Sequence, residues 1–370
     1  MAPAGPERAE AFMRVMKSHL MRMNEKQNAM TKACIAAGLD GTCDAVLHRS
    51  VLHALGDRVL VSVVVPTTPS RRWTHRALYD CFKKQTWPLR ELIVLETGGS
   101  TCPSPFWRKV ARKDDRVTYK YEARDVTLGR KRNRFAPMAE GSVVAQFDDD
   151  DVYAPEYLDV MVAALLGDAL DAYDGVDDAR LLEVLAEPRL AQLASWVGYC
   201  VASERILVYD AHEDRRADEA RAAERAAAGD THDRSFGWHS RFYGYGFAYV
   251  FTLAYQVASP FNDAMHLHQD YVFVCDGAVN ASARCVTFDD DLDYPCVVHI
   301  RHSGSSTDNP AIVPIDRPPG FPARQLRSLL ADAPAYDDEG DGGDDDPGDA
   351  EPENPEATTL RTLAKKVFAE

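Results

Sequence analysis

Between residues 58 and 165, apolar and polar positions alternate in blocks that predict strands and helices in turn. Runs of strand length stand at RVLVSVVVP (58–66), ELIVLE (91–96), RVTYKYEA (116–123) and GSVVAQF (141–147). The first is almost continuously apolar, which is typical of a strand buried on both faces of a parallel sheet. A helical pattern over 71–85 separates the first two runs. The spacing predicts right-handed crossovers and a parallel sheet whose ligand site lies at the carboxyl ends of its strands.

Outside this region the pattern changes. Residues 7–37 carry an apolar stripe with Arg and Lys between its members, which predicts an amphipathic helix. Such a helix packs against the main domain or lies on a membrane surface. Residues 213–229 are charged and Ala-rich and predict an exposed helix inserted in the second half. The apolar stripe of the helix predicted over 7–37 consists of Phe12, Met13, Met16, Leu20 and Met23.

Charge is concentrated near the end of the chain. The 370 residues carry a net charge of −16, and 337–356 alone contain 11 acidic residues and no basic ones. This stretch buries too little apolar surface to order itself, so we expect a disordered acidic tail, followed by a short amphipathic helix over 359–370. The absence of a basic footprint argues against nucleic-acid binding. No apolar run approaches 18 residues, which argues against a membrane span.

Cysteine usage and the first residues indicate a compartment. The eight cysteines show neither a CxxC pair nor zinc-finger spacing. The opening MAPAGPERAEAFMRVM lacks the apolar core of a secretory signal. We therefore expect reduced thiols and a cytoplasmic protein, in peripheral contact with a membrane if the first helix lies on one.

The strongest chemical signal is QFDDDDVYAPEYL, where Asp148 to Asp151 directly follow the fourth predicted strand. Adjacent carboxylates repel one another unless a cation or several donors neutralise them, and Mg²⁺ and Mn²⁺ prefer such oxygen ligands. In extended backbone, Asp148 and Asp150 point to the same side. The register, 148/150 or 149/151, stays open. The alternative is a polar turn that caps the following helix.

Together with GRKRN (129–133) and ETGGS (96–100), this segment resembles the nucleotide-sugar half of a family 2 glycosyltransferase of the GT-A fold. The resemblance implies that Pro66, Thr67 and Glu96 hold the nucleoside. It implies that Arg132 and Asn133 of the Gly-x-x-Arg-Asn pattern hold the diphosphate. It assigns Asp148 and Asp149 to the nucleotide-sugar, and Asp150 with His302 to Mn²⁺ or Mg²⁺.

The second half departs further from the family pattern. FNDAMHLHQDYVFV ends in Gln269-Asp270 where the family usually has Glu-Asp. The resemblance makes Asp270 the base that deprotonates the acceptor, the alternative being a cap of the following helix. His302 lies in CVVHIRHSGSST, and His299 competes with it for the metal role. Trp238 and Tyr243 would line the acceptor pocket, or else belong to the core.

These observations predict an α/β protein of the GT-A fold, with a Rossmann-like, mostly parallel sheet flanked by helices and a smaller mixed acceptor-side half. The expected activity is inverting, metal-dependent transfer from a nucleotide-sugar, preferably a UDP-sugar, to a hydroxyl of a glycan, lipid or protein. The alternatives are a non-catalytic nucleotide-sugar-binding module and a nucleotidyltransferase. The expected parts are an N-terminal helical segment (1–57), the nucleotide-sugar half (58–165), the acceptor and catalytic half (166–330) and the tail (331–370).

Overall fold

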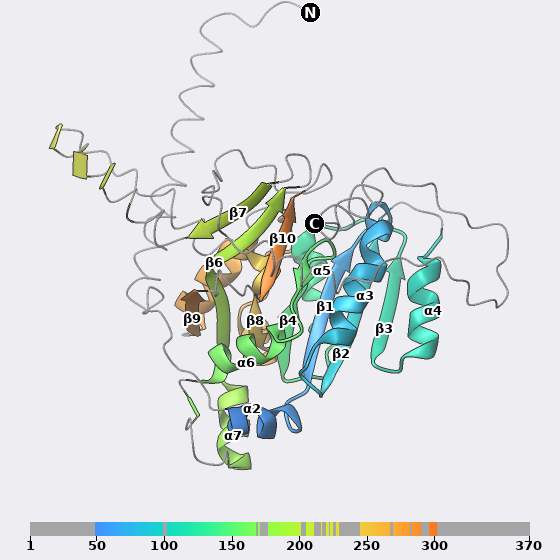
Figure 1. Ribbon diagram of the computed structural model, residues 1–370, viewed down its shortest axis with the longest axis horizontal. Helices are drawn as coiled ribbons and strands as arrows, with labels where there is room; N and C mark the ends of the chain where they lie inside the picture. The colour runs from blue at the N-terminus through green and yellow to red at the C-terminus, as the bar shows by residue number, and fades with distance from the viewer. Residues whose placement is uncertain are drawn as a thin grey trace, which may run out of the picture.

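The computed structural model describes parts of the chain between residues 49 and 301, which are drawn in colour in Figure 1. The helix expected over 7–37, the acidic tail, the terminal helix and most of the insertion at 213–229 fall outside the described residues. The described residues are 49–98, 102–167, 169–170, 177–200, 205–210, 245–266, 269–281, 283–289 and 296–301, with a few single positions between 216 and 228.

The first four strands confirm the predicted parallel arrangement. Strand β1 (Val61–Thr67) pairs in parallel with both β2 (Arg90–Thr97) and β4 (Val143–Gln146), and β2 pairs in parallel with β3 (Val117–Glu122). The resulting order is β3-β2-β1-β4. Every residue of β4 is buried, as its apolar sequence requires of a strand covered on both faces. Thr67 pairs with Glu96, so the carboxyl ends of β1 and β2 lie side by side.

The second half continues the same sheet rather than starting another. Strand β8 (Val250–Thr252) pairs antiparallel with β4 and joins it to the long strand β6 (Arg189–Cys200). The other partners of β6 are β7 (Arg205–Asp210), β9 (Arg284–Asp289) and β10 (Val297–Arg301), and β10 also pairs with β5 (Val152–Tyr153). The described residues thus form one mixed sheet of ten strands.

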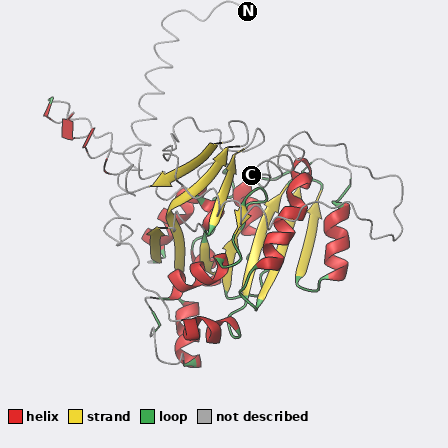
Figure 2. Ribbon diagram, in the orientation of Figure 1, coloured by secondary structure: helices red, strands yellow, loops and turns green. Residues whose placement is uncertain are grey.

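Helices flank the sheet on both faces (Figure 2). The sequence from 69 onward begins as a 3-10 helix, with Pro69 in its first turn where the missing N–H costs no hydrogen bond, and continues as an α-helix. The helices are α2 (Arg49–Gly56), η1 (Pro69–Thr74), α3 (His75–Lys84), α4 (Pro105–Lys113), α5 (Leu128–Asn133), α6 (Tyr157–Leu166), α7 (Asp178–Ala186), η2 (Gly246–Ala248), α10 (Leu253–Ala258) and α11 (Gln269–Asn280).

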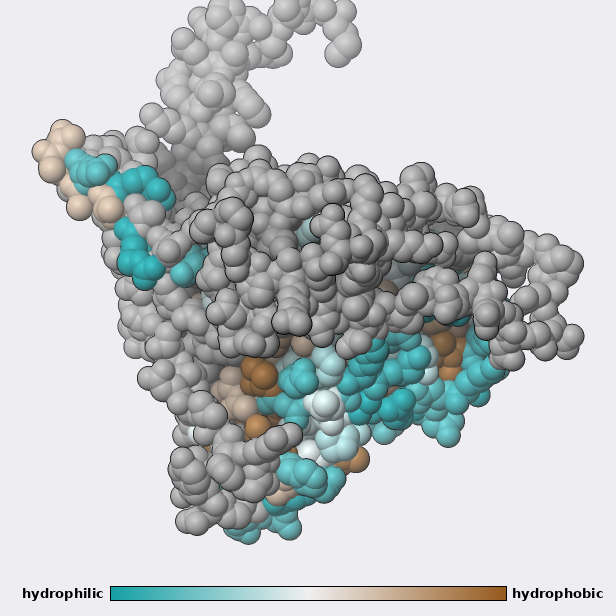
Figure 3. Space-filling model, viewed as in Figure 1, coloured by the Kyte–Doolittle hydropathy of each residue, from teal (hydrophilic) through white to brown (hydrophobic). Residues whose placement is uncertain are grey.

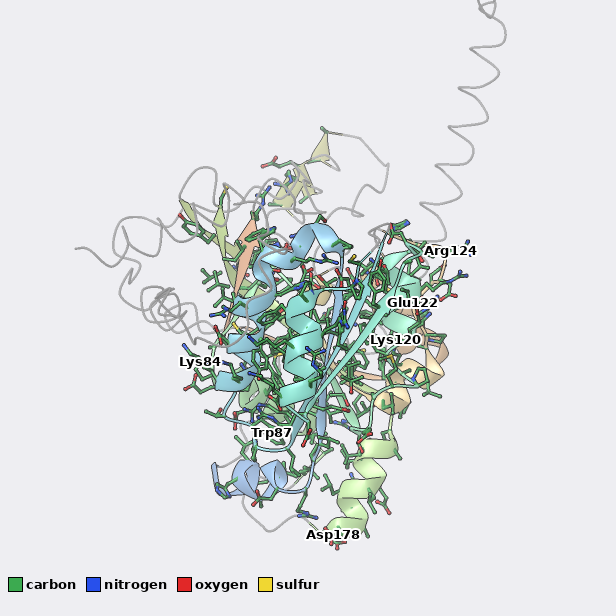
Figure 4. All side chains as sticks on the ribbon, turned by 90° about the vertical axis from the view of Figure 1, so that its right-hand side faces the viewer. Lys84, Trp87, Lys120, Glu122, Arg124 and Asp178 are labelled. Carbon is green, nitrogen blue, oxygen red and sulfur yellow. The ribbon has the colours of Figure 1, made fainter. Side chains whose placement is uncertain are left out.

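The sheet has two distinguishable ends. At the lower end in Figure 4, Trp87 is fully buried and its indole Nε1 donates to the Val59 carbonyl at 2.9 Å. Lys120 and Glu122 lie on β3, and Arg124 follows its carboxyl end, towards the top of that view. The described surface visible in Figure 3 is mainly hydrophilic with a few separate hydrophobic patches. No helix in the described part of the chain is long and apolar enough to cross a bilayer.

Candidate active site

The four aspartates form a loop at the carboxyl end of β4, next to the end of β1. The Thr67 hydroxyl at the end of β1 donates to Asp149 Oδ2 at 2.5 Å. The backbone N–H of Asp148 donates to the Tyr153 hydroxyl at 2.8 Å, and that hydroxyl donates to the Phe247 carbonyl at 2.8 Å. The first two residues of the loop are therefore held by β1 and by Tyr153, and Asp149 is 8% exposed.

Three of these carboxylates converge. Asp148, Asp150 and Asp151 each offer an oxygen, and these atoms lie within 4.8 Å of one another. Burial raises the pKa of Asp148, and the nearby charge of Asp150 acts in the same direction. Burial, followed by the charge of Asp150, raises the pKa of Asp149 well above its usual value. Neighbouring carboxylates that disfavour one another's ionisation are suited to bind a hard dication, because the cation stabilises their charged forms.

Two neighbours neutralise the far side of the loop. Arg71 in η1 forms an ion pair with Asp150. Asp151, 3% exposed, accepts from the Ile300 N–H at 2.9 Å and lies 2.9 Å from His299 Nδ1. Burial raises the pKa of Asp151 to about 6 against the opposing effect of His299. Burial alone would lower the pKa of His299, but Asp151 raises it to about 9.

Arg132 of α5 joins the acidic loop to the predicted base. Its side chain is 2% exposed; Nη2 lies 3.5 Å from Asp148 Oδ1, and Nη1 forms an ion pair with Asp270 at the start of α11. Gln269 Nε2 also donates to Asp270 Oδ1. The segment containing Gly246 closes over this bridge: a Cβ there would lie 2.6 Å from Asp270 Cγ and 2.7 Å from Arg132 Nη1.

The other members of GRKRN face different partners. Asn133 Nδ2 donates to the Phe261 carbonyl and to Asp263 Oδ1, both at 2.7 Å, while its Oδ1 accepts from the Phe261 N–H at 2.8 Å. Arg130 pairs with Asp263 at 3.2 Å, and both side chains are about half exposed. Asn133 thus anchors the chain at 261–263, and a role for it in nucleotide binding stays a prediction.

Glu96 is the centre of a second buried network. Its carboxylate accepts from Arg72 Nε and from the Ser104 N–H, both at 2.9 Å, and from the Tyr119 hydroxyl. The side chain is completely buried, so in this arrangement its oxygens bind protein groups. Its predicted contact with the nucleoside remains a prediction, as does that of Pro66, which is partly exposed in β1.

A histidine that the sequence did not single out connects the two networks. His75 Nε2 lies 3.1 Å from Thr67 Oγ1, and its Nδ1 lies 3.3 Å from Ser104 Oγ. Burial, and to a lesser extent the charge of Arg72, lower the pKa of His75 to about 3. His75 is therefore neutral at pH 7, and links the loop at Asp149 to the surroundings of Glu96 through hydrogen bonds.

The structure brings most predicted site residues to one edge of the sheet. Asp148, Asp149, Asp150, Arg132 and Asp270 converge there. His302, Trp238 and Tyr243 fall outside the described residues. The sequence placed Arg71 inside a helix and assigned it no role; its position directly after a strand that ends at the ligand edge is the signal that was available.

The arrangement is that of the GT-A fold, an α/β sheet with an acidic loop at the carboxyl end of its fourth strand. Residues 62–197 match the family described as glycosyl transferase family 2. The match runs past α6 to β6, beyond the 58–165 expected from the sequence. No protein of curated function matches the chain.

Several solved structures resemble the chain weakly. TarS 1-349 of S. aureus with UDP-GlcNAc has a TM-score of 0.43 and 14% identity over 74% of this chain and 66% of its own, so the chain spans just under two thirds of it. The mannosyltransferase PcManGT of Pyrobaculum calidifontis with GDP-Man and Mn²⁺ has a TM-score of 0.41 and 14% identity. The match covers 96% of this chain and 84% of PcManGT. Glucosyl-3-phosphoglycerate synthase of Mycobacterium tuberculosis with Mn²⁺, UDP and phosphoglyceric acid has a TM-score of 0.39 and 16% identity. The match covers 80% of this chain and 86% of the synthase.

Proposed function

We propose that the chain is an inverting, metal-dependent glycosyltransferase that moves a sugar from a nucleotide-sugar to an acceptor hydroxyl. The observation that carries the proposal is the bridge made by Arg132, which holds Asp148 of the acidic loop and Asp270 on one guanidinium. A nucleotide-sugar bound at the loop would have its reacting carbon near the carboxylate that the second half supplies. The preferred donor is a UDP-sugar, and the acceptor is a glycan, lipid or protein.

Asp148 and Asp150 fit a divalent cation better than Asp151 does. All three carboxylates converge, but that of Asp151 is already bound to the Ile300 N–H and to His299. We propose that this pair holds Mn²⁺ or Mg²⁺, with His302 as a further candidate. A bound dication would neutralise the charge that develops on the leaving diphosphate.

Asp270 is the proposed catalytic base. Its carboxylate takes the proton of the acceptor hydroxyl while that oxygen bonds to the anomeric carbon and the bond to the diphosphate breaks. A single displacement of this kind inverts the configuration. Arg132 and Gln269 hold the carboxylate in place, and the acceptor approaches from the half that we assign to 166–330. The donor occupies the half assigned to 58–165.

The deciding experiment measures UDP release from UDP-sugars with and without Mn²⁺, in the presence of a panel of acceptors. We expect Asp150→Asn to lose the metal-dependent rate and Asp270→Asn to lose transfer while still binding donor. Glu183→Gln, an exposed residue paired with Arg180 on α7, is the matched control and should retain activity. Proton NMR of the first product formed reports the anomeric configuration, and retention would contradict the inverting mechanism.

Donor identity is tested by thermal stabilisation. A nucleotide-sugar at 100 times its Kd adds about 2.7 kcal/mol to the unfolding free energy of the wild type. If a UDP-sugar binds with Mn²⁺ but neither the wild type nor Asp270→Asn turns it over with any acceptor, the chain is a binding module. Release of pyrophosphate from a nucleoside triphosphate would instead indicate a nucleotidyltransferase.

A further inference from the structure

Two consecutive arginines in η1 pair with acidic residues at the ends of two different strands. Arg71 pairs with Asp150 after β4, whereas Arg72 Nε donates to Glu96 Oε1 at 2.9 Å at the end of β2. Arg72 Nη2 also donates to the Cys102 carbonyl at 2.5 Å. The contacts of Arg72 are thus with a completely buried carboxylate and a backbone carbonyl, whereas Arg71 faces the loop that we assign to the metal and the diphosphate.

The surroundings of Arg71 are strongly anionic. Its side chain is 15% exposed and that of Asp150 is 9% exposed, so water screens the pair weakly. Burial alone would lower the pKa of Arg71, but the charges of Asp150, Asp149 and Asp148 outweigh it and raise the pKa. The guanidinium therefore neutralises the same carboxylates that a dication would.

The two cations compete for one carboxylate. Arg71 Nη1 contacts Oδ2 of Asp150, and Asp150 is also one of the three residues whose oxygens converge. A dication on Asp150 weakens the attraction of that carboxylate for the arginine. A guanidinium displaced from it would lie at the edge of the sheet where the donor's diphosphate is expected, and its planar fork matches phosphate oxygens.

We propose that Arg71 is a diphosphate-binding residue that pairs with Asp150 before the metal arrives and exchanges that carboxylate for the donor's phosphate oxygens afterwards. The proposal rests on the proposed function, because it requires a nucleoside diphosphate at the acidic loop. It predicts effects of opposite sign on two ligands when Arg71 is removed: the metal alone binds more tightly, and the nucleoside diphosphate binds more weakly.

Isothermal titration of the full chain with Mn²⁺ alone, and with UDP or GDP in saturating Mn²⁺, separates the two effects. We expect Arg71→Ala to bind Mn²⁺ about three- to tenfold more tightly, because a competing cation is gone. The same variant should bind the nucleoside diphosphate at least about tenfold more weakly, because a charge-assisted hydrogen bond is lost. Arg108→Ala, at an exposed position on α4, is the matched control and should match the wild type on both ligands.

Arg71→Lys provides a second variant, which keeps the positive charge and removes the planar guanidinium. It should bind Mn²⁺ as the wild type does and bind the nucleoside diphosphate with an intermediate affinity. If Arg71→Ala does not fold, the result for Arg71→Lys decides, and an unchanged diphosphate affinity overturns the inference. If the wild type binds both ligands but Arg71→Ala behaves like Arg108→Ala, the inference fails while the proposed function stands. A wild type that binds neither ligand would overturn both.

Discussion

His299 on β10 holds Asp151 of the acidic loop, with Nδ1 2.9 Å from one carboxylate oxygen and 3.0 Å from the other. The next residue of the strand, Ile300, adds a backbone N–H to the same carboxylate at 2.9 Å. Because β10 belongs to the second half of the chain, the loop that follows β4 is positioned by both halves. Asp151 therefore acts as an anchor of the loop.

This pair predicts a pH dependence of stability. The pKa of His299 is raised to about 9 in the folded chain, above its usual value of 6.5. Its stabilising contribution is therefore fully present below pH 6.5 and is lost as the pH rises through about 9. The difference in unfolding free energy between the wild type and His299→Gln should shrink by at least about 1 kcal/mol between pH 6.5 and pH 10.

Urea denaturation at the two pH values measures this difference, and groups common to both proteins cancel. His53→Gln, at an exposed position on α2, is the control and should keep the pH dependence of the wild type. A constant difference between wild type and His299→Gln would show that His299 is not charged in the folded chain.

The bridge made by Arg132 predicts a large loss of stability. Arg132→Met leaves Asp148 and Asp270 without their shared cation, and removing one partner of a buried ion pair costs about 3–5 kcal/mol. Arg130→Ala is the matched control in the same helix: its pair with Asp263 is half exposed, so its loss costs about 1 kcal/mol or less. Chemical denaturation at pH 7 compares the two, and equal losses would contradict the bridge.

The first four strands were predictable because apolar runs of strand length report burial on both faces. Their observed bounds differ from the predicted ones by only a few residues. The position of the acidic loop was predictable too, because Asp148 to Asp151 directly follow the apolar run of the fourth strand. The ion pairs of Arg132 with Asp148 and Asp270 bring together residues that are far apart in sequence, and the roles assigned to them stay predictions.

The second half could not be predicted in this way. Strand β6 carries Gln192 and Ser195 at buried positions, so its sequence does not show a strand's apolar pattern. Its pairing with strands from distant parts of the chain is set by tertiary contacts and not by local sequence. The choice of His299 as the partner of Asp151 depends on that pairing, since Val298 aligns with Val197 and with Val152, the residue after Asp151.

His75 predicts a loss of stability in acid. Its pKa is lowered to about 3 by burial and then by Arg72, so the folded chain keeps it neutral where the unfolded chain protonates it. Its contribution is present above pH 6.5 and falls as the pH drops towards 3. Between pH 7 and pH 5 the wild type should lose about 2 kcal/mol more than His75→Gln does.

Thermal or urea unfolding at both pH values measures this effect. His266→Gln, at an exposed position, is the control and should follow the wild type. If His75→Gln lost as much stability as the wild type over this range, the hydrogen bonds from His75 to Thr67 and Ser104 would have to survive protonation of the ring.

Gly246 predicts a specific coupling with the proposed base. A Cβ at this position would lie 2.6 Å from Asp270 Cγ and 2.7 Å from Arg132 Nη1, closer than side-chain atoms approach. Gly246→Ala should therefore displace the Asp270 carboxylate, lower stability by about 1–3 kcal/mol through overpacking, and abolish transfer.

In an Asp270→Ala background the colliding carboxylate is gone, so the same substitution should cost less. A double-mutant cycle on unfolding free energies measures this coupling, which should exceed about 0.5 kcal/mol for residues in contact. Additive effects would mean that Gly246 and Asp270 do not touch, and would remove the reason for glycine at this position.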